Sequence, residues 1–168
     1  MQKAVFLDRD GVINVDKAYV YKIEDFEFCE SVFEVLRHFQ KLGYLLIIVT
    51  NQSGIGRGYY REEDFQTLSA WMRNELLEAK ITLDAIYHCP HAPEANCECR
   101  KPKSGMFEEA IKTFDIDVKS SWMIGDKTSD IEAAMGAKIE NTILLGEDQN
   151  SGAKYCVNLV LDTIKFIS

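Results

Sequence analysis

Five short apolar runs, spread along most of the chain, constrain the fold more than any other feature of the sequence. They lie at residues 3–8, 45–50, 84–89, 121–126 and 141–146. Most are apolar at successive positions, so both faces of each strand must be covered. Such strands occur in parallel sheets that have helices on both sides. The sequence therefore predicts a mostly parallel sheet between two helical layers.

Segments of helical period separate these runs. The first has apolar residues at helical spacing before a natural stop at Gly43: Val32, Val35, Leu36 and Phe39. Three more helices are predicted to begin near Arg61, Ser104 and Lys127. The inward residues expected on the last two are Phe107, Ala110, Ile111 and Phe114, then Ile131, Ala134 and Met135. The alternation of strands and helices predicts a doubly wound, Rossmann-like α/β fold. After Glu147 we expect a last strand at 157–161 and a short helix.

Length and charge limit the classes of function. The 168 residues suit one domain over residues 1–168. With 19 basic and 27 acidic residues the net charge is -8, which argues against nucleic acid and anionic membranes as partners. No stretch approaches the roughly 20 apolar residues of a membrane span, and the N-terminal run is too short for a signal peptide. We expect a cytoplasmic monomer with a small-molecule partner.

Carboxylates follow two of the apolar runs. Asp8 and Asp10 come after the first run, where residues i and i+2 point the same way, and Gly11 permits a sharp turn. Asp126 ends the fourth run. Ligands of such sheets bind beyond the carboxyl ends of the strands, where three converging carboxylates would need a cation such as Mg²⁺. Each aspartate alone is equally consistent with an ordinary turn or helix cap.

Polar side chains follow the second apolar run, and two basic residues lie further along the chain. The second run ends in Thr50, Asn51, Gln52 and Ser53, whose hydroxyl and amide groups suit phosphate oxygens but also suit a plain turn. Arg100 and Lys101 are two cations beside a constrained loop, although a solvated side chain is the default for either.

A cysteine-rich loop at 89–101 precedes that basic pair. Its candidate ligands are Cys89, His91, Cys97 and Cys99. Three thiolates and one imidazole form a tetrahedral set suited to structural Zn²⁺, with a disulfide or simple core thiols as alternatives. Zinc would fix a segment that has little core of its own and would aim Arg100 and Lys101. His88 should point away from the cluster, and Cys29 and Cys156 are expected to be buried thiols.

Four ordered motifs together resemble the haloacid dehalogenase superfamily of phosphatases. They are DRDG at 8–11, TNQ at 50–52, RKP at 100–102 and GDKTSD at 125–130, and the resemblance covers roughly residues 1 to 140. One departure is Val12, where many relatives carry threonine. Only 41 residues separate Asp8 from Thr50, which leaves no room for an inserted cap domain.

The resemblance implies a set of catalytic roles. Asp8 would attack phosphorus and form an aspartyl phosphate, and Asp10 would protonate the leaving oxygen and then activate water. Thr50 and Lys101 would bind the phosphoryl oxygens. The Mg²⁺ would be held by Asp8, Asp126 and the main-chain carbonyl of Asp10.

Two further charged residues, Lys127 and Asp130, follow the fourth run. Lys127 would balance the carboxylates. Asp130 would either support the outer shell of the metal or sit in the first turn of a helix, and the latter is favoured.

The cysteine-rich loop is similar to the zinc loop of bacterial heptose bisphosphate phosphatases and histidinol phosphate phosphatases. The segments NVDKAYV at 14–20 and FEF at 26–28 extend the likeness to the former. In that branch, substrate is contacted by the residues that match Asp16, Lys17, Ala18, Tyr19, Asn51, Gln52, Ser53 and Arg100. The implied function is Mg²⁺-dependent hydrolysis of a phosphorylated sugar in surface-polysaccharide biosynthesis, with structural Zn²⁺. Alternatives are a histidinol phosphate phosphatase, a polynucleotide 3′-phosphatase and a non-catalytic zinc-stabilised module.

Overall fold

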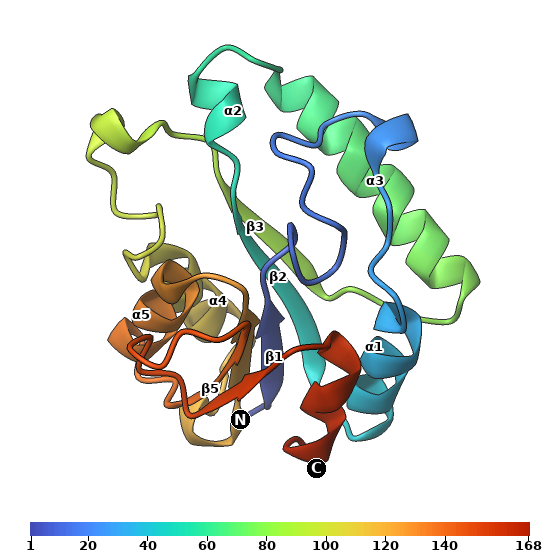
Figure 1. The fold of residues 1–168 in the computed structure, drawn as a ribbon, viewed down its shortest axis with the longest axis vertical. Helices are drawn as coiled ribbons and strands as arrows, with labels where there is room; N and C mark the ends of the chain where they lie inside the picture. Colours follow the sequence, from blue (N-terminus) through green and yellow to red (C-terminus); the bar gives the residue numbers. More distant parts are fainter.

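The computed structural model describes residues 1–168 and contains one six-stranded sheet in which every pair of neighbouring strands is parallel (Figure 1). The strand order across the sheet is β3-β2-β1-β4-β5-β6. The strands are β1 (Ala4–Leu7), β2 (Leu45–Asn51), β3 (Ala85–Cys89), β4 (Trp122–Gly125), β5 (Asn141–Leu145) and β6 (Tyr155–Val157). This arrangement confirms the predicted doubly wound α/β fold.

Helices cover both faces of the sheet (Figure 1). The α-helices are α1 (Val32–Lys41), α2 (Ser53–Gly56), α3 (Glu62–Glu78), α4 (Gly105–Phe114) and α5 (Thr128–Gly136). Short 3₁₀ helices are η1 (Ile23–Asp25), η2 (Pro93–Ala95), η3 (Val118–Ser120) and η4 (Val160–Lys165). In Figure 1, α1 and α3 lie on one side of the strands, and α4 and α5 on the other. None of these helices combines the length and the apolarity that a bilayer span requires.

Strand β1 lies at the centre and contributes to both hydrophobic cores. Val5 and Leu7 pack with the buried residues of α1 and α3, whereas Ala4 and Phe6 pack with those of α4 and α5. All four side chains are fully buried, as expected for a strand that has no polar face. The sites at the carboxyl end of β1 are therefore supported by rigid packing on both sides.

The predicted helix boundaries are close to the observed ones. Arg61 and Lys127 precede α3 and α5, and their backbone N–H groups donate to the carboxylates of Asp64 and Asp130, three residues further on. Gly43 follows α1 with a φ of 88°, a conformation that glycine adopts without strain.

Two burial predictions were wrong. Met135 on α5 is 47% exposed, and Cys156 is an exposed thiol on the three-residue edge strand β6. Ile111 and Phe114 face inward as predicted and pack against the core of α4 and α5, although both are only partly buried, and Cys29 is partly buried against the other core. The strand predicted at 157–161 is β6, which ends at Val157, because the chain then enters η4. Periodicity identifies an apolar stripe without indicating how much of it a neighbouring element covers.

The adjacent leucines of α3 test the packing of this helix. Leu76 is fully buried and Leu77 is 60% exposed. We expect Leu76→Ala to lower the free energy of unfolding by about 2–5 kcal/mol, because it removes apolar contacts and leaves a cavity. Leu77→Ala should change it by no more than about 0.5 kcal/mol. Urea denaturation of both variants checks the difference, and equal effects would contradict this packing.

Candidate active site

The carboxyl ends of β1 and β4 meet at the point where the strand order reverses. From β1 the chain continues to β2 on one side, and from β3 it crosses to β4 on the other. The backbone N–H of Asp8 donates to the carbonyl of Ile124 at 3.1 Å, so residues 8 and 126 end neighbouring strands. Crevices at such points are the usual ligand sites of open α/β sheets.

Lys101 is the central cation of this crevice. Its side chain is 2% exposed, and its Nζ lies 3.0 Å from Asp8 Oδ1 and 2.6 Å from Asp130 Oδ1. The same Nζ donates to the carbonyl of Val49 at 2.8 Å. All three N–H bonds of the ammonium group are therefore directed at protein acceptors. Asp130 does lie in the first turn of α5, as favoured from the sequence, but its pairing with Lys101 was not predicted.

Burial and charge shift the pKa values of these groups. Burial raises the pKa of Asp8 well above its usual value, the negative charge of Asp130 adds to this, and Lys101 opposes it. Burial alone would lower the pKa of Lys101, but the carboxylates of Asp8 and Asp130 outweigh it and raise that pKa. The pKa of Asp126 is also raised, by burial and then by Asp130. The site thus holds more negative charge than its cations neutralise.

The donor set fits a divalent cation. Asp8, Asp126 and Asp130 each place a carboxylate oxygen within 4.8 Å of the others. Both oxygens of Asp130 are occupied, by Lys101 and by the backbone N–H of Lys127, whereas the buried Oδ1 of Asp126 has no hydrogen-bond partner. Gly11 has a φ of 93°, and a Cβ there would overlap the Asp126 carboxylate. Oxygen ligands of this kind suit Mg²⁺, with Asp8 and Asp126 as the available carboxylates.

The carboxylate of Asp10 is held from several sides. Its Oδ1 accepts hydrogen bonds from Arg9 and Asn14, each at 3.0 Å, and its Oδ2 accepts one from Gln52 at 3.2 Å. Arg9 is almost fully buried and also donates to the carbonyl of Val20, which ties the loop at 14–22 over the site. Arg9 could not be identified from the sequence, because a charged residue between two aspartates gives no signal of burial.

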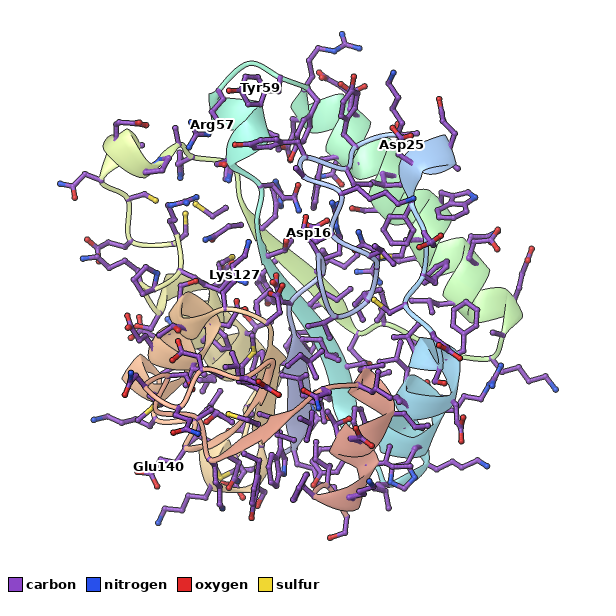
Figure 2. The ribbon with its side chains drawn as sticks, in the orientation of Figure 1. Asp16, Asp25, Arg57, Tyr59, Lys127 and Glu140 are labelled. Carbon is purple, nitrogen blue, oxygen red and sulfur yellow. The ribbon has the colours of Figure 1, made fainter.

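A cleft of about 550 Å³ opens beside these groups. It is lined by Asp10, Asp16, Ala18, Tyr19, Asn51, Gln52, Ser53, Arg57, Tyr60, Arg100, Lys101, Pro102, Lys127 and Ser129. Most predicted substrate-binding residues are among them, but Lys17 is exposed and does not line the cleft. Arg57, Tyr60 and Ser129 were not predicted. Figure 2 shows Asp16, Arg57 and Lys127 toward the end of the sheet where β1 and β2 finish.

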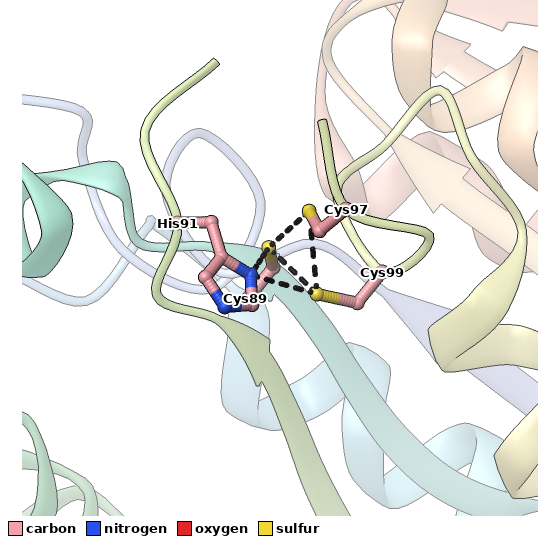
Figure 3. Close-up of side chains that lie close together, drawn as sticks. All are labelled: Cys89, His91, Cys97 and Cys99. Atoms are coloured by element: carbon pink, nitrogen blue, oxygen red, sulfur yellow. Dashed lines mark hydrogen bonds between the residues drawn. The ribbon is translucent and has the colours of Figure 1, made fainter. Parts of the chain in front are cut away.

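The cysteine-rich loop brings its four predicted ligands together (Figure 3). His91 Nδ1 lies 3.4 Å from Cys89 Sγ and 3.3 Å from Cys99 Sγ, and Cys97 Sγ lies 3.6 Å from both other sulfurs. Zinc–sulfur bonds of about 2.3 Å in a tetrahedron place sulfurs roughly 3.8 Å apart, which is close to both distances from Cys97, whereas Cys89 Sγ and Cys99 Sγ lie nearer to each other, at 2.9 Å. Three thiols and one imidazole are a donor set suited to Zn²⁺, and bound zinc would require these two sulfurs to move apart. The cysteines are free, with no disulfide among them. His88 points away and its Nε2 contacts Glu62, as expected.

This loop is joined to the crevice through backbone contacts. The N–H of Gly56 in α2 donates to the carbonyl of Pro90, and the N–H of Gly105 in α4 donates to that of Glu98. A Cβ on either glycine would overlap the loop backbone. At the end of the loop, the side chain of Asn51 both donates to the carbonyl of Lys101 and accepts from its N–H. The cluster is thereby coupled to the position of Lys101.

The fold and this site define a hydrolase of the haloacid dehalogenase class, and the HAD-hydrolase-like family model matches residues 98–163. The chain is 55% identical over 150 residues to the D-glycero-alpha-D-manno-heptose-1,7-bisphosphate 7-phosphatase of Campylobacter jejuni, covering 89% of this chain and 86% of that protein. It is 45% identical over 179 aligned positions to the D-glycero-beta-D-manno-heptose-1,7-bisphosphate 7-phosphatase of Pasteurella multocida, covering 99% and 97%. The chain belongs to this family of D-glycero-D-manno-heptose-1,7-bisphosphate 7-phosphatases.

A solved structure shares both the fold and most of the chain length. The D,D-heptose 1,7-bisphosphate phosphatase from B. bronchiseptica, complexed with magnesium and phosphate, superposes with a TM-score of 0.86 at 26% identity. The match covers 98% of this chain and 97% of that one. No cap domain interrupts the sheet, in agreement with the prediction from spacing.

The buried ammonium group of Lys101 can be tested by its effect on stability. We expect Lys101→Met to lower the free energy of unfolding by about 3–5 kcal/mol in metal-free buffer, because Asp8 and Asp130 lose their common partner inside the protein. The control is Lys103→Met, since Lys103 is 56% exposed and 3.8 Å from an exposed Glu98, and it should cost less than about 1 kcal/mol. Similar costs in urea denaturation would contradict this account.

Proposed function

We propose that this protein is a Mg²⁺-dependent phosphatase that removes the 7-phosphate of D-glycero-D-manno-heptose 1,7-bisphosphate. The proposal is carried by one combination: near full-length similarity to relatives named for this activity, together with a buried Asp8 paired to Lys101 at the strand switch point. The product, a heptose 1-phosphate, belongs to the biosynthesis of surface polysaccharides, and we expect the enzyme to work in the cytoplasm as a monomer.

In the first step Asp8 attacks the phosphorus atom of the 7-phosphate. Its Oδ1 accepts hydrogen bonds from Lys101 and from the N–H of Arg9, which favours Oδ2 as the attacking atom. A P–O bond to Asp8 forms while the P–O bond to the sugar breaks, and Asp10 gives its proton to the departing oxygen. Thr50 binds a phosphoryl oxygen, where charge spreads in the transition state. Lys101 turns the N–H bond that it donates to Asp8 toward another phosphoryl oxygen, because Asp8 loses its negative charge as it bonds to phosphorus.

In the second step water replaces Asp8 on phosphorus. Asp10, now ionised, accepts a proton from the water, and the P–O bond to Asp8 breaks to release inorganic phosphate. When bound by Asp8, Asp126 and the main-chain carbonyl of Asp10, Mg²⁺ offsets the repulsion between carboxylate and phosphate. Burial and Asp130 raise the pKa of Asp126, and the charge of the nearby Lys127 opposes this rise, in line with a charge-balancing role.

The rest of the cleft is proposed to bind the sugar and its second phosphate. Asp16, Ala18 and Tyr19 border it from the loop at 14–22, and Asn51 and Ser53 border it from the end of β2. Arg100 has a buried Nη1 without a hydrogen-bond partner, so it retains a donor for an anionic group. An arginine suits a phosphate that must be held without being hydrolysed.

Two alternative enzymes remain candidates for comparison. A histidinol phosphate phosphatase would share the catalytic residues and the cysteine-rich loop, but the full-length relatives are named for heptose bisphosphates. A polynucleotide 3′-phosphatase would need extended contacts to a charged backbone, which a net charge of -8 disfavours. A non-catalytic module would leave the buried pairing of Asp8 with Lys101 without a purpose.

The substrate and the nucleophile can be tested together. We expect phosphate release from heptose 1,7-bisphosphate, either anomer, to exceed that from histidinol phosphate and from a 3′-phosphorylated oligonucleotide. Asp8→Asn should lower kcat by at least about 10³-fold, because the amide cannot form the aspartyl phosphate. The exposed Asp25→Asn serves as the control and should retain wild-type turnover. Wild-type turnover by Asp8→Asn would remove the proposed role.

The cysteine-rich loop is proposed to bind one structural Zn²⁺, which would hold Arg100 and Lys101 in place. Elemental analysis should find one zinc per chain in the wild type and in Cys156→Ser, and little in Cys97→Ser. We expect Cys97→Ser to show faster hydrogen exchange at 89–101 and a kcat/KM lowered by roughly 10²-fold, because the phosphate-binding groups are misplaced. A zinc-free protein with full activity would contradict this role.

A further inference from the structure

The side chain of Gln52 lies between the two groups that are proposed to handle the proton and the phosphate. It is 3% exposed, and its Nε2 donates to Asp10 Oδ2 at 3.2 Å and to Thr50 Oγ1 at 2.9 Å. The sequence predicts that Gln52 binds substrate. Both N–H bonds of the amide are directed at protein acceptors, so Gln52 has no side-chain donor left for substrate.

The orientation of this amide is determined by its neighbours. An ionised carboxylate only accepts hydrogen bonds, so the NH₂ group of Gln52 must face Asp10 and the carbonyl oxygen must face away. On that side the hydroxyl group of Tyr60 donates to Gln52 Oε1. Burial raises the pKa of Tyr60 to about 12, with Arg9 opposing the shift, so the hydroxyl keeps its proton near neutral pH.

Tyr60 is itself held in place by two contacts. Its ring stacks on Tyr21 with centroids 5.0 Å apart and planes inclined by 7°. Its edge lies against Gly54, where a Cβ would overlap the ring. Tyr60 is 5% exposed. The hydroxyl group therefore has a defined position, set by the loop at 14–22 and by α2.

The hydrogen bonds of Asp10 select the oxygen that exchanges the proton. Oδ1 accepts from Arg9 and Asn14, so a proton on Asp10 belongs on Oδ2, which is the oxygen that Gln52 contacts. Thr50 Oγ1 accepts from the same amide, so the Thr50 hydroxyl directs its own proton elsewhere. One amide thus sets the direction of two groups at once.

We propose that Tyr60 is a positioning residue: acting through Gln52, it fixes the plane of the Asp10 carboxyl group for proton transfer to the leaving oxygen. The inference rests on the proposed phosphatase function and goes beyond it, because Tyr60 touches none of the reacting atoms. The contribution of Tyr60 to kcat/KM should therefore be larger for substrates whose leaving group must be protonated.

The test compares phosphate monoesters with different leaving groups. Nitrophenyl phosphate loses its leaving group without a proton, whereas an alkyl or sugar phosphate requires one. Tyr60→Phe keeps the ring contacts and removes the hydroxyl. We expect kcat/KM of Tyr60→Phe to fall about 10- to 100-fold for alkyl phosphates and less than about threefold for nitrophenyl phosphate. The expected loss is smaller than the roughly 10²- to 10⁴-fold contribution of a general acid, because Asp10 itself is still present. KM for the alkyl esters should change little relative to kcat.

Tyr44→Phe is the matched control. Tyr44 is also buried, and its hydroxyl donates one hydrogen bond at 3.1 Å, to the carbonyl of Ser168 away from the site. In Tyr44→Phe, kcat/KM should depend on the leaving group as it does in the wild type. If Tyr60→Phe lowered kcat/KM equally for all esters, or left the dependence unchanged, the positioning role would be excluded.

A second variant tests the route through Gln52. Gln52→Met should show the selective loss for poor leaving groups together with a loss common to all esters, because it also removes the hydrogen bond to Thr50. Adding Tyr60→Phe to Gln52→Met should cause no further loss, because Tyr60 acts only through Gln52. Additive losses would overturn the inference. If the wild-type protein hydrolysed none of the esters, the proposed phosphatase function would be rejected. If the wild type were active and Tyr60→Phe had the same activity, only the positioning role would be rejected.

Discussion

The pairing of the Lys101 ammonium group with Asp8 and Asp130 is the interaction on which the rest of the crevice depends. A buried cation is stable only when each of its donors is used, and here the acceptors come from β1, β2 and the first turn of α5. These segments are far apart in the sequence. The pairing therefore requires the whole central part of the sheet to be assembled before the crevice has its shape.

The loop that carries Lys101 is fixed independently of that pairing. It contributes almost no side chains to the hydrophobic cores, apart from Cys89 and its partly buried partners. Instead, Gly56 and Gly105 allow backbone to pack directly on backbone at its two sides. The cysteine and histidine cluster lies between these contacts. A metal held there would act on the phosphate only through geometry, by determining where the segment from Cys99 to Lys101 emerges.

Local patterns in the sequence predicted the features that depend on neighbours along the chain. Carboxylates at strand ends, the four clustered ligands and the helix starts at Arg61 and Lys127 all follow from spacing within a few residues. The role of Arg9 could not be predicted in this way, because it depends on the loop at 14–22 folding over it. The pairing of Lys101 with Asp130 joins two separate motifs. The exposure of Cys156 likewise follows from its place on an edge strand with one neighbour.

Because no cap domain is present, the loop at 14–22 both covers the catalytic groups and borders the cleft. It covers Asp10 through the bond from Arg9 to Val20, and two aromatic pairs, Tyr19 with Tyr59 and Tyr21 with Tyr60, tie it to the connection between α2 and α3. Its residues Asp16, Ala18 and Tyr19 also border the cleft. The segment that would recognise the sugar is thus the one that supports Tyr60. Because both tasks share one loop, substitutions that alter its shape should change substrate preference and proton transfer together, whereas a separate cap would allow the two to vary independently.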